Sequence, residues 1–248
     1  MADYKFPTEM VELPSKGYFY FDGHPLSKGK VEVKYMTARE EDILTSQNLI
    51  QQGTVIDKLL ESLIVDKSIK IDDMLIGDKN AIMVSARILG YGKDYEFTYE
   101  GKEHKIDLSK LEPVDIDFSK FKKGVNEFEF KLPNSERSIT FKLLSGNDER
   151  GIESEIKARK KVSKSYSAEL TTRLKKMILA IDGNREPSFI NNFVDNEFLS
   201  RDSLAFREYL ATVTPDVDMN TTVVNSAGKE IEVAIPVTLR FFWPTAGV

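Results

Sequence analysis

The stretch "VKYMTAREEDILTSQNL", Val33 to Leu49, changes from a strand pattern to a helix pattern within a few residues. It overlaps "KVEVKY", residues 30–35, in which apolar and polar residues alternate with the period of a half-buried strand. Thr37 is a suitable N-cap for a helix, and Glu40, three residues later, completes a capping box. The next two residues are also acidic, which suits the positive end of a helix dipole. We therefore expect this charged run to build a helix start before it does anything else.

Apolar residues at helical spacing predict further helices along the chain. The first helix should end at Gly53, and the third should end at Gly90. The predicted helices after the first cover residues 54–65, 79–89, 145–162, 168–181, 188–194 and 201–213.

Strand-like alternation occurs in three other places, each interrupted by turn residues. These predicted hairpins turn at residues 100–101, 133–135 and 226–228. The sequence therefore predicts an α+β fold with a helical bundle-like core and β-hairpin segments. We divide it into an N-terminal β entry with a helical unit (1–90), an antiparallel β segment (91–145), a helical segment (146–215) and a C-terminal β hairpin (216–248).

The composition limits the kinds of function that this chain can have. Its 248 residues can bury a large core, and the absence of cysteine excludes disulfides, thiolate zinc sites and iron–sulfur clusters. Lysine and arginine number 35 against 40 acidic residues, a net charge of −5 that argues against a globally basic nucleic-acid binder. No signal-peptide pattern or run of about 18 apolar residues is present, so we expect a soluble protein made in a cytoplasm, with no membrane partner.

The search for catalytic patterns indicates a protein that is not an enzyme and needs no cofactor. The two histidines, His24 and His104, lie in separate turn or hairpin segments, and no nucleophile elbow or phosphate loop is present. The acidic pair at Asp72 and Asp73 is more typical of solvated residues than of a metal site. A metal-dependent enzyme remains an alternative that would need acids and histidines from distant segments.

A basic run at the end of one predicted helix, Lys157 to Lys164, offers a second alternative. Such a run could contact phosphates, which would make the protein a nucleic-acid adaptor. Cations are also favoured at a helix C-terminus for electrostatic reasons. The run has few aromatic residues nearby on which bases could stack. We therefore interpret it first as a solvated helix end.

Aromatic residues gather near both ends of the chain. "YFYF" occupies residues 18–21, and Phe241, Phe242 and Trp243 lie near the C-terminus. Aromatic side chains dominate protein interfaces as well as cores, so these residues are candidates either for the core or for partner contacts.

Several motifs in order along the chain resemble the baseplate hub and hub-assembly proteins of T-even-type bacteriophages. The motif "YMTAREEDIL", residues 35–44, is the most specific of them. The others are "VELPSKGYFY", "VIDKLLESLI", "LIGDKNAIMVSARILGYG", "FKLLSGNDE", "TPDVDM" and "VTLRFFWP". The resemblance implies a role in hub assembly through protein–protein contacts, as a structural component or an assembly chaperone.

The same resemblance implies partners, a location and a contact surface. The partners would be other hub or hub-assembly proteins, met in the host cytoplasm during assembly and, if the protein is a structural component, also in the virion tail baseplate. Tyr35, Arg39, Glu40 and Glu41 become candidate contact residues beside the C-terminal aromatics. Relatives resemble zinc ribbons in two hairpins with cysteine pairs, whereas residues 97–108 and 223–235 of this chain contain none, so these would be degenerate knuckles without metal.

Overall fold

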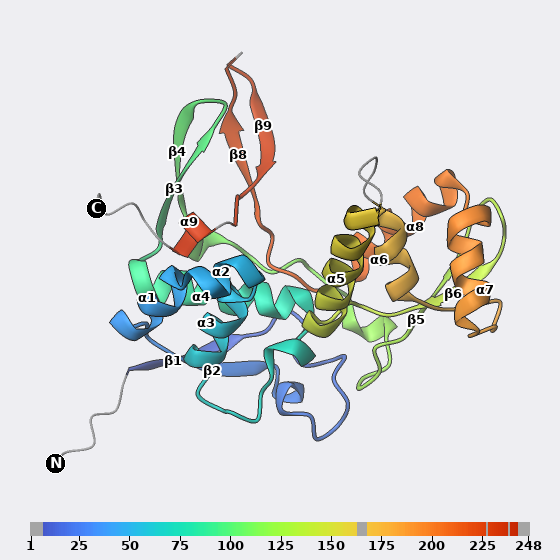
Figure 1. The fold of residues 1–248 in the computed structure, drawn as a ribbon, viewed down its shortest axis with the longest axis horizontal. Coiled ribbons are helices and arrows are strands. Elements are labelled where there is room, and N and C mark those ends of the chain that lie inside the picture. Colours follow the sequence, from blue (N-terminus) through green and yellow to red (C-terminus); the bar gives the residue numbers. More distant parts are fainter. Residues whose placement is uncertain (1–6, 163–167, 227, 238, 243–248) are drawn as a thin grey trace.

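The computed structural model describes residues 7–162, 168–226, 228–237 and 239–242. It confirms the α+β class: helices alternate with small antiparallel sheets in one chain (Figure 1). In Figure 1, helices α1 to α4 lie on one side of the body and α5 to α8 on the other. Among the described residues, no helix is both long and apolar enough to cross a membrane.

The N-terminal part combines one hairpin with four helices. Its elements are β1 (Thr8–Glu12), β2 (Lys30–Lys34), α1 (Ala38–Thr45), α2 (Gln47–Gln52), α3 (Val55–Leu63) and α4 (Ile76–Tyr91). β1 and β2 pair antiparallel, with Val11 opposite Val31. Their buried valines, together with the apolar face of α3, pack around the central helix α4.

Two hairpins extend from the same side of the body (Figure 1). The first is β3 (Asp94–Tyr99) with β4 (Lys102–Asp107), and the second is β8 (Asn220–Val224) with β9 (Glu230–Ala234). The predicted turns at residues 100–101 and near 226–228 are confirmed. The short helix α9 (Leu239–Phe242) follows β9 and packs against α4.

The remaining part encloses a three-stranded sheet with helices. Its elements are β5 (Phe128–Lys131), β6 (Ser138–Phe141), α5 (Gly146–Val162), α6 (Glu169–Met177), β7 (Ile178–Ile181), α7 (Pro187–Asn192) and α8 (Ser200–Val213). The strand order is β5–β6–β7, all antiparallel. The inward rings of Phe128, Phe141 and Phe206 fill the space between this sheet and α8.

One predicted helix is wrong in its last four residues. The sequence predicts a helix over residues 168–181, but it ends at Met177 and the last four residues form strand β7. "ILAI" is a short apolar run that suits a buried strand as well as a helix. The open edge of β6 decides between the two, because pairing there satisfies the backbone of both strands.

The three-stranded sheet also crosses one of the segment boundaries that we predict from the sequence pattern. β5 and β6 precede residue 146 and β7 follows it, so hydrogen bonds cross that proposed boundary. The division into four segments stays a prediction from the sequence.

Candidate partner-contact surfaces

The start of α1 holds a buried charged cluster. Glu40 has no exposed surface, and its carboxylate accepts hydrogen bonds from the Thr37 amide at 2.9 Å and the Thr37 hydroxyl at 2.6 Å. The Lys34 ammonium lies 2.9 Å from its other oxygen. Burial would raise the pKa of Glu40, but the hydrogen bonds from Thr37 and Lys34 outweigh it and lower the pKa to about 2. The predicted capping box is confirmed, and Lys34 ties it to β2.

The neighbouring candidate residues face different surroundings. The Tyr91 hydroxyl donates to Glu41 at 3.0 Å, which links α1 to the end of α4. Burial, together with this bond, raises the pKa of Tyr91 to about 12. The Tyr35 hydroxyl donates to Glu9 at 3.2 Å, and Arg39 is exposed. Arg39 is thus the most available of these side chains for a partner.

Replacing Glu40 by glutamine should lower stability in a pH-dependent way. Because the pKa of Glu40 in the folded chain lies below its ordinary value of 4.5, the charge stabilises the fold above that pH. This contribution is lost as the pH falls from 4.5 toward 2. We expect Glu40→Gln to cost roughly 2–3 kcal/mol at pH 7 and much less near pH 3.

Urea unfolding of wild type and variant between pH 3 and pH 7 measures this difference. The exposed Glu103 provides a control, since Glu103→Gln should change stability by less than about 0.5 kcal/mol at either pH. A cost for Glu40→Gln that stays constant with pH would contradict the charged capping box.

The C-terminal phenylalanines lie in the core, which is one of the two locations that the sequence leaves open. Phe241 and Phe242 have no exposed surface. The Phe241 ring packs edge-on against Tyr95 at 5.0 Å, at the base of the first hairpin. These two rings offer no free surface to a partner, and Trp243 lies outside the described residues. In "YFYF", Phe19 and Tyr20 are buried, whereas Phe21 is 62% exposed.

The two projecting hairpins are fastened to each other at their tips. Glu100, in the first turn, accepts hydrogen bonds from the amide and hydroxyl of Ser226, in the second turn, at 3.0 and 2.9 Å. Lys102 donates to the Asn225 carbonyl oxygen at 3.1 Å. Side-chain and backbone groups thus join the two tips. The zinc-ribbon description finds no support: no group of three or more metal-ligating residues gathers within the described residues.

Removing the tip contact should loosen the hairpins locally. Glu100→Gln weakens the acceptor for the Ser226 amide, so that amide should exchange with solvent faster. The melting temperature should change by less than about 2 °C, because the contact is exposed. Hydrogen exchange followed by NMR provides the measurement, and exchange at Ser226 as slow as in wild type would contradict the tip contact.

The two histidines serve separate local structures. The His24 Nδ1 accepts from the Leu26 amide at 3.2 Å and so caps a short 3-10 helix. His104 lies in β4 with its ring 5.7 Å from that of Phe97. Of the predicted acidic pair, Asp72 forms an ion pair with Arg150. His24, His104 and Asp72 therefore each have a contact within the fold.

The basic end of α5 is partly neutralised within its own helix. Lys157 lies 3.4 Å from Glu153, and Arg159 lies 2.7 Å from Glu155, each one turn earlier. Lys164 lies outside the described residues. This arrangement favours a solvated helix end over a phosphate-binding surface.

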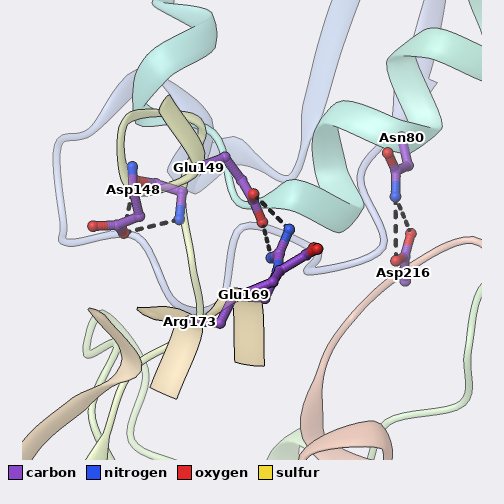
Figure 2. Close-up of polar contacts among 7 residues, drawn as sticks. Asn80, Asp148, Glu149, Glu169, Arg173 and Asp216 are labelled. Carbon is purple, nitrogen blue, oxygen red and sulfur yellow. Dashed lines mark hydrogen bonds and ion pairs between the residues drawn. The ribbon is translucent and has the colours of Figure 1, made fainter. Parts of the chain in front are cut away.

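Polar contacts join elements that are distant in sequence (Figure 2). Figure 2 shows Arg173 of α6 facing Glu149 of α5, with two parallel contacts between guanidinium and carboxylate. Glu169, one turn before Arg173, lies beside the same guanidinium at 3.5 Å. Further along, the Asn80 amide donates to Asp216 at 3.0 Å and so connects α4 to the segment before β8. These side chains stabilise contacts between elements of the fold.

An apolar groove beside β1 was not predicted from the sequence. It is a groove of about 520 Å³ between residues 9–14, one face of α4 and several residues between 108 and 118. Its floor is formed by buried apolar side chains, among them Val11, Val84 and Leu108. Exposed carboxylates stand at its rim: Glu9, Glu12 and Asp115. The residues that form it lie far apart in sequence and only the fold brings them together.

Fold and surface define the class of protein. It is an α+β protein whose charged clusters form contacts within the fold and which has an apolar groove beside a strand, a shape suited to contacts with other proteins.

The family model described as "T4 bacteriophage base plate protein" matches residues 8–243. The chain belongs to this family and is therefore a structural protein of the phage baseplate, the terminal part of the virion tail. Searches of curated proteins and of solved structures found no significant match.

Proposed function

We propose that this protein acts in assembling the central hub of the baseplate through contacts with other hub or hub-assembly proteins. It does so in the host cytoplasm without catalysing a reaction. The family match over nearly the whole chain carries the proposal. The charged clusters that pair within the fold and the apolar groove beside β1 are consistent with a protein that binds other proteins.

A phage lacking this gene provides the test. Wild-type protein supplied from a plasmid should restore plaques and complete baseplates, as counted by electron microscopy. Without it, hub intermediates should accumulate while other tail parts form. Normal baseplates in the absence of the protein would overturn the proposal.

Quantitative mass spectrometry distinguishes a built-in component from a chaperone. Several copies per purified virion would make the protein part of the hub. Abundance in the assembling lysate with none in virions would make it an assembly factor that leaves.

A further inference from the structure

The outer edge of β1 is a strand edge without a neighbour in the described structure. The sheet that contains β1 has two strands, so β1 is paired on one side only. The amide of Leu13 donates to the carbonyl of Gly29 at 2.9 Å, and that of Tyr35 donates to the carbonyl of Pro7 at 3.1 Å. The odd-numbered residues therefore bond to β2. The even-numbered ones, Thr8, Met10 and Glu12, direct their N–H and C=O groups away from it.

The partner strand confirms this alternation. Glu32 on β2 lies opposite Met10 and must also point its backbone outward. Its carbonyl accepts a hydrogen bond from the Val65 amide at 3.0 Å, beyond the sheet. The chain thus covers part of the outer edge of β2 with its own backbone.

The groove runs along this free edge. Every residue from Glu9 to Pro14 lines it, including residues from both faces of the strand, as expected for a space that meets β1 edge-on. Residues 113–116 and apolar residues of α4, among them Val84 and Ile88, line it as well. The space therefore combines a row of backbone hydrogen-bonding groups with apolar surface, which is what an added strand requires.

The charges at the rim indicate the chemistry of the occupant. Glu9, Glu12 and Asp115 are exposed carboxylates around the groove. The one basic residue among its described lining, Lys16, places its ammonium over the ring of Phe118 at 5.5 Å. A segment with basic residues would meet complementary charge, and an acidic one would be repelled.

We propose that β1 binds an extended segment of a partner protein as an added strand. Alternate apolar side chains of that segment fill the groove, and its lysines or arginines lie among the exposed carboxylates that line it. The identity of the partner as a baseplate protein rests on the proposed function, whereas the mode of binding rests on the groove alone.

Two defined peptides test the charge and the backbone separately. The first is a fluorescein-labelled seven-residue peptide that alternates lysine and valine, and the second replaces each lysine by glutamate. We expect the lysine peptide to bind the full chain at least 10-fold more tightly in fluorescence anisotropy. The double variant Glu12→Lys/Asp115→Lys should reverse this preference. Glu103→Lys/Glu230→Lys changes the net charge equally on exposed hairpin positions and should alter affinity less than 2-fold.

Met10→Pro removes an outward N–H from an edge position where proline is tolerated. Binding of the lysine peptide should fall at least 10-fold. Hydrogen exchange on the wild-type protein gives a readout without any variant: the peptide should slow exchange of the Met10 and Glu12 amides and leave Val11, already bonded to β2, unchanged.

Three results would overturn the proposal. They are equal binding of both peptides, no binding of the lysine peptide up to 1 mM, or a bound peptide that leaves the Met10 and Glu12 amides unprotected. Plaque complementation by the wild-type protein is scored independently, so a failure of strand addition is distinguishable from a failure of the role in hub assembly.

Discussion

Replacing Gly77 by alanine is expected to lower the free energy of unfolding by about 3–5 kcal/mol. Gly77 lies in the first turn of α4, where the segment after α8 crosses it. A Cβ atom there would overlap the carbonyl oxygen of Pro215 and approach the Cα of Asp216 to 2.7 Å. Both obstacles are backbone, so the new methyl group can be accommodated only if the two segments separate.

Gly151 is the matched control for this substitution. It is also a helical glycine, in α5, but a Cβ there would meet only the flexible end of Lys176 at 3.4 Å. Gly151→Ala should therefore stabilise by roughly 0.5–1 kcal/mol through helix propensity. Urea unfolding of both variants gives effects of opposite sign if α4 and the crossing segment touch as described. A Gly77→Ala variant as stable as wild type would contradict this contact.

Asp78→Ala is expected to cost about 3–5 kcal/mol, because it leaves several buried donors without an acceptor. The Asp78 carboxylate has no exposed surface and accepts from the amide and hydroxyl of Ser15 at 2.9 and 2.6 Å. The Tyr20 hydroxyl donates to it at 2.6 Å and accepts in turn from the Leu75 amide at 2.9 Å. Burial raises the pKa of Asp78 despite these bonds. The network fastens the N-terminal loop to the start of α4.

Two further variants identify the source of that cost. Asp73→Ala removes an exposed acid five residues earlier and should change stability by less than about 0.5 kcal/mol. Tyr20→Phe keeps the ring but orphans the Leu75 amide, so an intermediate cost of about 1–2 kcal/mol is expected. Urea unfolding measures all three, and equal stability of Asp78→Ala and Asp73→Ala would show that the buried network contributes little.

Local patterns determined much of the fold. The capping box at Thr37 and Glu40 and the turns at 100–101 and near 226–228 follow from residues within four positions of each other. Short-range hydrogen bonding and backbone preference set these features, so the sequence alone predicts them. The family resemblance, carried by motifs such as "YMTAREEDIL", is likewise a property of the sequence, and the match over residues 8–243 confirms the baseplate family.

Long-range pairing decided the rest. Residues 178–181 are a strand because β6 offers an edge, and Phe241 is buried because the first hairpin presents Tyr95 to it. The sequence around Asp78 predicts only an ordinary helix start. The carboxylate becomes a buried acceptor because residues 15–20, which carry its donors Ser15 and Tyr20, pack against it. The groove beside β1 is formed by segments about a hundred residues apart. Burial and surface shape depend on which distant segments meet, and that is decided by the tertiary structure.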